Sequence, residues 1–375
     1  MALQGESLTI DHGTPRQVTL AEIDGELEAL VREAMGSESR RTFGRMLTLV
    51  VYSEVDEPLE TAHALVGEIV VRASGRAILI HRVPHAHAGD LEAFISTHCL
   101  MRDEEQAERC AELVTLHTHA ASVDQLRNAV LSLRLQDLPL VVWWRAPLNL
   151  QDPLFLSLSK VCDQMILDSA RFNSPAAQLA QSVAWMRRQS DRVLFGDINW
   201  ARLIPWRELI AQFFDTPEHL DYLDRLDEMD LTYSERDHAN ATQVMLIVAW
   251  LATLLKWQVV EGSWQQKGSD HQFKLLSQGR EIRVEIKADP NAEAPAGWLT
   301  DVAMRATGEP PAEFQINWCG EDCVTTLVKI GDRVAERSSS LYVPGEVTLV
   351  CEEFDAARRD RVYAQALQVL EQLIQ

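Results

Sequence analysis

The stretch DLPLVVWWR, residues 137–145, is an apolar run that ends in two tryptophans and an arginine, just before Pro147. A short run rich in β-branched and aromatic side chains predicts a buried β-strand. Because neighbouring residues of a strand point to opposite faces, we expect one of Trp143 and Trp144 in the core. The other is expected at the sheet edge with Arg145.

Similar apolar runs lie on both sides of this stretch and alternate with helical patterns. Thr19 and Glu22 have the spacing of a capping box, and the residues that follow predict an amphipathic helix ending near Gly36. Further strands are expected at residues 46–52, 77–83, 113–117, 161–168 and 193–197, and helices at residues 59–71, 123–133 and 176–188. This alternation predicts a layered α/β domain with a mostly parallel sheet over residues 15–205.

The pattern changes after Trp206. Helices are expected at residues 208–214, 241–256 and 354–374. Turn signals separate short strands expected at residues 229–233, 257–261, 272–276, 282–287, 312–318, 324–330 and 347–351. We therefore predict an α/β chain whose second domain, residues 206–375, is α+β with an antiparallel sheet.

Charge and composition favour some compartments and partners over others. The net charge of −21 on 375 residues creates a field that repels nucleic acid and anionic membrane surfaces. The start of the chain does not resemble a secretory signal, and its longest apolar segment, residues 244–255, is too short to span a bilayer. Six scattered cysteines are not a dense disulfide framework. We expect a cytoplasmic protein that binds neither nucleic acid nor membranes.

Common catalytic and cofactor motifs are missing from the sequence. It contains no Walker loop, G-x-G-x-x-G, G-x-S-x-G or H-E-x-x-H pattern. His85 and His87 form one alternating pair and His117 and His119 another, but neither has further metal ligands at a fixed spacing. We favour the interpretation that these histidines are polar residues of loops or strand ends. We accordingly predict no catalytic residues, no metal and no cofactor.

Two smaller motifs leave alternatives open. Asp168 and Ser169 follow an apolar strand, where α/β sheets place ligand crevices, although capping or pairing with loop amides is the favoured reading. Cys319 and Cys323 are compatible with a redox switch, half a zinc site, or two thiols beside a turn.

A second tryptophan- and arginine-rich stretch is DINWARLIPWR, residues 197–207. Tryptophan and arginine are enriched at binding hot spots. An internal structural role agrees equally well with this stretch. In that role Asp197 pairs with Arg202 or Arg207, and the tryptophans seal the seam between the domains. Asn199 is suited to cap the following turn, and Pro205 suits a first helical turn. The residues expected to bind a partner or to organise its interface are Trp143, Trp144, Arg145, Asp197, Asn199, Trp200, Arg202, Trp206 and Arg207.

These stretches, together with LDSA at residues 167–170 and AWLATLLKW at residues 249–257, resemble the glucose-6-phosphate dehydrogenase assembly protein family, OpcA. The resemblance covers most of residues 15–260 and, more loosely, the remainder. It implies a non-catalytic allosteric activator that binds glucose-6-phosphate dehydrogenase and promotes its active oligomer. The implied role is in the oxidative pentose phosphate pathway and NADPH supply.

Two other functions remain open. One is a sugar phosphate or nucleotide sensor, or an enzyme, that uses a crevice near Asp168. The other is a redox adaptor based on Cys319 and Cys323. The family's cyanobacterial members respond to redox state, but this chain has no cysteine after Cys351, so a C-terminal thiol switch is not implied. The sequence does not specify the protein's own oligomeric state.

Overall fold

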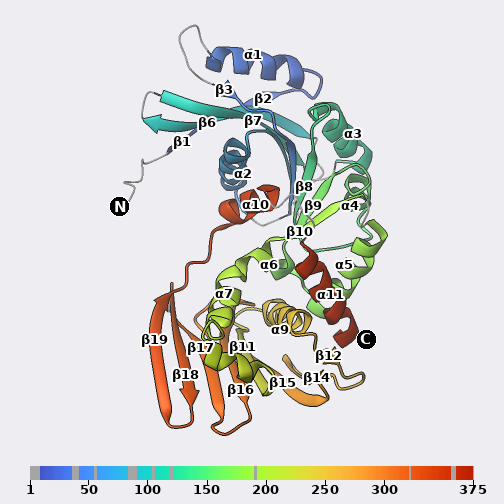
Figure 1. Ribbon diagram of the computed structural model, residues 1–375. Coiled ribbons are helices and arrows are strands. Elements are labelled where there is room, and N and C mark those ends of the chain that lie inside the picture. The colour runs from blue at the N-terminus through green and yellow to red at the C-terminus, as the bar shows by residue number, and fades with distance from the viewer. Residues whose placement is uncertain are drawn as a thin grey trace. The chain divides into compact units, whose positions relative to one another are not determined.

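The computed structural model describes residues 9–35, 42–54, 57–82, 91–103, 106–118, 121–189, 192–320, 322–355 and 360–374. Two compact units each contain one β-sheet (Figure 1). Unit 1 comprises residues 1–168, 189–196 and 345–358, and unit 2 comprises residues 169–188, 197–344 and 359–375. The sequence predicts a single boundary after residue 205. The chain instead passes between the units several times, because residues 169–188 belong to unit 2 and residues 345–358 belong to unit 1.

The sheet of unit 1 is mainly parallel, as predicted. Its strands run in the order β1-β6-β7-β5-β4-β8-β9-β10, with β2 on β6 and β3 on β7. The pairs from β7 to β9 are parallel, and β6 is antiparallel to β7. The strands are β1 Thr9–His12, β2 Arg16–Val18, β3 Thr42–Phe43, β4 Thr48–Ser53, β5 Arg76–Arg82, β6 Glu92–Asp103, β7 Gln106–Thr118, β8 Leu140–Arg145, β9 Gln164–Leu167 and β10 Leu194–Asp197.

Helices complete the α/β layers around this sheet. They are α1 Ile23–Met35, α2 Leu59–Ala73, α3 Val123–Leu133, α4 Pro153–Leu158 and α10 Glu346–Asp355. Every residue of β4 and β8 is buried, which explains why these strands read as continuous apolar runs.

β8 lies inside the sheet, between β4 and β9, so the prediction that one tryptophan lies at the sheet edge with Arg145 is wrong. Trp143 and Trp144 are both core residues, 0% and 2% exposed.

The prediction of a strand at residues 347–351 is also wrong, because these residues belong to helix α10. The segment is rich in β-forming residues, but Leu349 and Val350 are buried and the helix packs against α2. Tertiary packing therefore outweighs local β propensity here. The final predicted helix, residues 354–374, is present as α11 Arg361–Ile374 but begins later, and residues 354–355 belong to the end of α10.

The sheet of unit 2 is mostly antiparallel, also as predicted. Its order is β12-β14-β15-β11-β16-β17-β18-β19, with β13 on β14, and only the β11–β15 pair is parallel among the pairings described. The strands are β11 Leu226–Ser234, β12 Gln258–Val259, β13 Gln265–Lys267, β14 Asp270–Ser277, β15 Arg280–Asp289, β16 Leu299–Ala306, β17 Ala312–Gly320, β18 Cys323–Ile330 and β19 Arg333–Ser340.

Helices cover one face of this second sheet. They include α5 Pro175–Gln189, α6 Ile198–Arg202, α7 Ile204–Gln212, α8 Pro217–Leu223, α9 Thr242–Leu254 and α11, and a short 3-10 turn, η1, spans Ser169–Arg171. Burial alternates along β14, β16 and β17, so one side of the sheet is core and the other is half-exposed. Helix α9 is almost entirely buried. Within the described ranges, no helix has both the length and the apolar character needed to cross a membrane.

Candidate functional site

The carboxyl ends of the parallel strands in unit 1 form the first candidate site. The chain passes from β4 to β5 on one side of the sheet and later reaches β8 on the other side, so the strand order reverses between β4 and β8. Open α/β sheets bind ligands at such switch points. The residues that end these strands are Ser53 on β4, His81 near the end of β5 and Arg145 on β8.

Arg145 is held at this edge by two carboxylates of its own unit. It donates to Glu57, to Glu346 at 3.0 Å and to Ser53 Oγ at 3.4 Å, and it is 6% exposed. Burial disfavours the charged guanidinium, but Glu346 and Glu57 outweigh this effect, so the pKa of Arg145 is raised. The predicted interface residue Arg145 is therefore a neutralised interior cation.

A pair of histidines lies at the ends of the neighbouring strands. His81 Nδ1 is 3.0 Å from His117 Nδ1, and the two rings are stacked. Burial and the neighbouring His117 lower the pKa of His81, which keeps its imidazole neutral. His85, His87 and His119 lie outside the described residues. Among the residues that are described, no three His, Cys, Asp or Glu side chains form a group suited to a metal ion.

The second predicted block, residues 197–207, forms a buried polar network in unit 2. Asp197 Oδ1 accepts hydrogen bonds from the backbone amides of Ser169 and Asn199, both at 3.0 Å, and caps α6. Its Oδ2 accepts from the hydroxyl of Tyr363 at 2.9 Å. Asp197 is 2% exposed, so this carboxylate joins three segments that are distant in the sequence.

Asn199 extends the network instead of capping the next turn. Its side-chain amide donates to Ser169 Oγ at 3.0 Å, and its carbonyl oxygen accepts from Gln243 at 2.9 Å. Asn240 donates to the backbone carbonyl of Ser169 at 3.2 Å. Ser169 is 1% exposed and Asp168 3%. Ser169 thus lies inside this network, where its backbone amide donates to Asp197 and its hydroxyl accepts from Asn199.

Trp200 connects the block to the last helix. Its indole N–H donates to Asp360 at 2.8 Å, and the Arg207 guanidinium lies over its ring at 3.8 Å. Burial lowers the pKa of Arg207 to about 10. Trp206 is 3% exposed, whereas Arg202 is half-buried. The block is largely internal, and its position favours organising unit 2 over direct contact with a partner.

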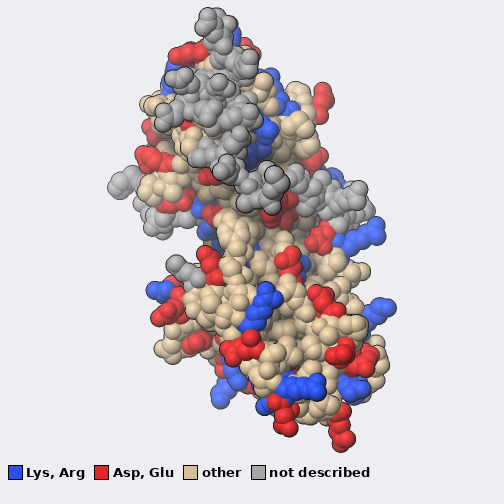
Figure 2. All heavy atoms as spheres, turned by 60° about the vertical axis from the view of Figure 1, so that its left-hand side comes forward, with Lys and Arg blue, Asp and Glu red and all other residues tan. Residues whose placement is uncertain are grey.

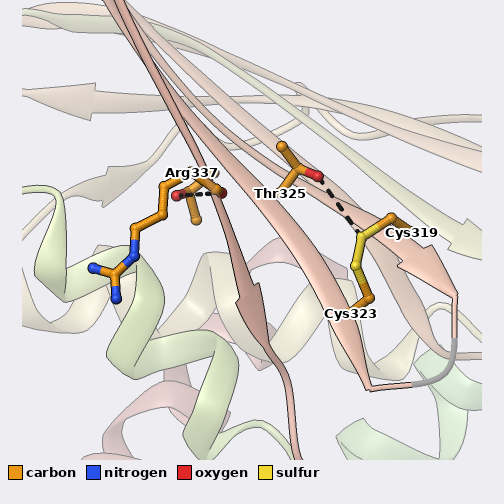
Figure 3. The surroundings of a disulfide bond; sticks show 5 residues. Cys319, Cys323, Thr325 and Arg337 are labelled. Carbon is orange, nitrogen blue, oxygen red and sulfur yellow. Dashed lines mark hydrogen bonds between the residues drawn. A yellow bond between two sulfur atoms is a disulfide. The ribbon is translucent and has the colours of Figure 1, made fainter.

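Cys319 and Cys323 form a disulfide across the β17–β18 hairpin (Figure 3). The Thr325 hydroxyl lies 3.7 Å from Cys319 Sγ and points toward it. Cys319 is exposed, so a small thiol reagent can reach the bond.

A second disulfide, between Cys99 and Cys110, joins directly opposed residues of β6 and β7. With four of six cysteines paired, cysteine usage does not identify the cellular compartment.

The half-exposed face of the second sheet is a surface that was not predicted from the sequence. One lateral row of opposed residues on this face is Glu285, Asp230, Ala303, Gln315, Leu327 and Glu336. Beside it, Arg305 bonds to Asp230 at 2.5 Å, Glu313 at 3.0 Å and Glu228 at 3.2 Å. Opposed residues of adjacent strands share a face. The row therefore forms a continuous, mostly polar surface interrupted by Ala303 and Leu327, which we call the open face.

Three cyanobacterial proteins, each named "Putative OxPP cycle protein OpcA", are similar to this chain. The protein of Synechococcus elongatus is 29% identical over 291 residues, which are 75% of this chain and 63% of that protein. Those of Nostoc punctiforme and Synechocystis sp. are 29% and 30% identical, over 60% and 54% of this chain and 48% and 42% of their own lengths. The chain thus spans less than two thirds of these relatives.

Solved structures show a weak similarity to the chain, with low sequence identity and TM-scores below 0.5. A levoglucosan dehydrogenase in complex with NADH and L-sorbose is 11% identical, with a TM-score of 0.48, over 87% of this chain and 94% of that one. An NAD binding oxidoreductase from Klebsiella pneumoniae is 10% identical, with a TM-score of 0.46, over 88% and 96% of the two chains.

Two family models match the sequence in order. The model described as the glucose-6-phosphate dehydrogenase subunit N-terminal domain matches residues 66–184, and the model described as its C-terminal domain matches residues 193–367. The matched residues include parts of both units. The chain belongs to the OpcA family of glucose-6-phosphate dehydrogenase assembly proteins.

Proposed function

We propose that this protein is a non-catalytic, cytoplasmic partner of glucose-6-phosphate dehydrogenase that binds the enzyme and favours its active oligomer. The observation that carries this proposal is the match of both halves of the chain to domains described as a subunit of that enzyme. The relatives' name adds the oxidative pentose phosphate cycle as the setting. Support of NADPH supply would follow from activation of the dehydrogenase.

The chemistry at the switch point of unit 1 supports binding over nucleotide chemistry. A dinucleotide pyrophosphate needs a close-fitting glycine-rich turn and unopposed N–H groups at a helix N-terminus. Here the connection from β4 to α2 carries Glu54, Glu57 and Pro58, and Glu346 lies beside them on Arg145. These carboxylates would repel phosphate groups, and they are already paired with the nearby arginines: Glu54 with Arg82, and Glu57 and Glu346 with Arg145.

We assign partner contact to the open face, with the 197–207 block as the interior that holds unit 2 in shape. The open face carries both charge signs: Arg305 is surrounded by Glu228, Asp230 and Glu313, and Arg283 bonds to Glu228 at 2.7 Å. Ion pairs held in place before binding lower the entropy cost of a polar interface. Acidic and basic side chains are also interspersed on the surface visible in Figure 2.

Activation needs little differential affinity. A ligand that binds one state of its partner better than another shifts the partner's population toward that state. A tenfold shift corresponds to about 1.4 kcal/mol. A few well-packed contacts supply that amount.

Substitution of Ala303 by arginine is expected to weaken binding to the dehydrogenase at least roughly tenfold, equivalent to about 1.4 kcal/mol. Ala303 lies between Asp230 and Gln315 in the row of the open face, so a long side chain there blocks close approach without removing an existing hydrogen bond. The measurement is co-sedimentation with the cognate enzyme at several concentrations.

The matched control is Ala129 to arginine on helix α3 of unit 1, which should bind the enzyme as the wild type does. If Ala303→Arg binds with unchanged affinity, the open face is not the contact surface. If the variant alters only self-association, the face joins copies of this chain, and the assignment to the enzyme is wrong.

A second candidate function, a redox adaptor, is favoured by the accessible Cys319–Cys323 disulfide. A dithiol reductant would break the bond between the two sulfur atoms, leaving two thiols while the reductant forms its own disulfide. We expect reduction to change the apparent affinity for the dehydrogenase in the wild type but not in a Cys319→Ser, Cys323→Ser double variant. Equal affinity of the oxidised and reduced wild type would remove this function.

A further inference from the structure

A cavity of about 280 Å³ lies within unit 2, beside the first turn of α5. Its walls include Ala176 and Ala177 of α5, Met245 of α9, and Ser269 and His271 at the β13–β14 hairpin. The volume is at the lower end for small-molecule sites. Small side chains line most of it, so its walls leave room for a compact ligand.

The helix supplies hydrogen-bond donors to this cavity. Gln178 is the first residue near the start of α5 whose amide is bonded back along the chain, to the Ser174 carbonyl at 2.9 Å. The amides of Ala176 and Ala177 belong to the first turn, where N–H groups have no acceptor within the helix. The dipole of this 15-residue helix places partial positive charge at the same point.

A buried histidine supplies an independent sign of a missing partner. His271 is 7% exposed, and its Nδ1 is a buried atom without a hydrogen-bond partner among the described residues. Its ring packs on Trp264 at 4.9 Å, which fixes the orientation of the imidazole. A buried polar atom without a partner is costly, and this one belongs to a residue that lines the cavity.

The charges around the cavity are compatible with an anion. No aspartate or glutamate is among the residues that line it. Glu235 and Asp270 adjoin the lining, and a hydrogen bond orients each carboxylate: Glu235 accepts from the Ser269 hydroxyl, and Asp270 accepts from the amide of Ala288 at 2.9 Å. The donors of the cavity have to outweigh these two negative charges. Burial lowers the pKa of His271, so its imidazole is neutral, and in the Nδ1–H tautomer the unpartnered nitrogen is a donor.

We propose that this cavity binds a small oxyanion, a phosphate or carboxylate group, between the first-turn amides of α5 and the imidazole of His271. Helix N-termini bind such groups through free N–H donors and the helix dipole together. This site is separate from the open face and does not depend on binding to the dehydrogenase. It gives unit 2 a place for a small anionic metabolite.

The test is a titration of the full-length protein with inorganic phosphate and, in a second arm, with acetate, at constant ionic strength. NMR signals of the Ala176 and Ala177 amides and of the His271 ring report on the site. We expect saturable shifts of these signals, while His63 of unit 1 stays unchanged as an internal control. Stronger binding of phosphate identifies a phosphate ligand, and stronger binding of acetate identifies a carboxylate.

Two variants make the assignment specific. Ala176→Pro removes one donor from the first turn, and His271→Phe keeps the ring against Trp264 but removes its nitrogens. Each is expected to weaken binding at least roughly tenfold, read from the remaining amide signals. Absence of saturable shifts with both anions, or unchanged affinity in both variants, would overturn the proposal.

Discussion

Replacement of Asp197 by alanine is expected to destabilise unit 2 by about 3–5 kcal/mol, because several buried donors lose their acceptor at once. The carboxylate accepts from the amides of Ser169 and Asn199 and from the Tyr363 hydroxyl, and it is 2% exposed. The loss is measured by urea unfolding followed through tryptophan fluorescence, with Trp200 in the same unit as a reporter.

Tyr363→Phe is the matched control for this prediction. It removes only the hydroxyl that donates to Asp197 Oδ2, so a loss of about 1 kcal/mol is expected. If Asp197→Ala cost no more than Tyr363→Phe, the two backbone amides would not depend on this carboxylate. The network would then not be what holds the 197–207 block in place.

Unit 1 is expected to lose stability steeply in acid because of a buried histidine cluster. His98 Nδ1 lies 3.0 Å from His12 Nδ1, and its Nε2 lies 3.0 Å from Ser96 Oγ, which is also 2.9 Å from His63 Nε2. His98 is 0% exposed. Burial, followed by the neighbouring His63 and His12, lowers the pKa of His98 to about 3.

The direction of the effect follows from proton binding. In the unfolded chain His98 binds a proton below pH about 6.5, whereas in the folded chain it remains neutral until pH about 3. Between these values the unfolded state holds the extra proton. Each unit of acidification in this range therefore removes about 1.4 kcal/mol of stability for this one group.

His98→Gln isolates this contribution, since glutamine keeps a polar side chain but does not titrate. The measurement is the free energy of unfolding between pH 4 and 6, where the variant should show a shallower slope by about 1.4 kcal/mol per pH unit. The non-titrating Ala129→Arg variant of unit 1 should leave the wild-type slope unchanged. Equal slopes for His98→Gln and wild type would mean that His98 is protonated in the folded protein.

Much of the fold was predictable because local signals and burial agree. One arm of the predicted capping box is present, with the Thr19 amide donating to the Glu22 carboxylate at 3.2 Å, and helix α1 follows it. β8 is buried throughout and reads as an apolar run. By contrast, β19 has the polar sequence RVAERSSS and is mostly exposed, so neither hydrophobicity nor alternation marks it as a strand. In β16, by contrast, apolar and polar residues do alternate, and Val302 and Met304 are buried. This strand could therefore have been predicted from its sequence pattern.

The candidate sites were less predictable, because their partners are distant in the sequence. The local sequence singles out Asp197 and Arg145 as candidate site residues. It does not show that Tyr363 bonds to Asp197 or that Glu346 bonds to Arg145. The same limit applies to His271, whose unpartnered nitrogen becomes apparent only once α5 lies beside the hairpin. The open face depends on strand register, which a half-exposed polar pattern specifies weakly.

The most direct test of the central claim is the rate of the cognate glucose-6-phosphate dehydrogenase at varied glucose 6-phosphate, with and without saturating purified protein. A binding partner that favours the active oligomer predicts a lower KM or a higher maximal rate, and no turnover by the protein alone. Superimposable rate curves, or turnover of glucose 6-phosphate by the isolated chain, would contradict it.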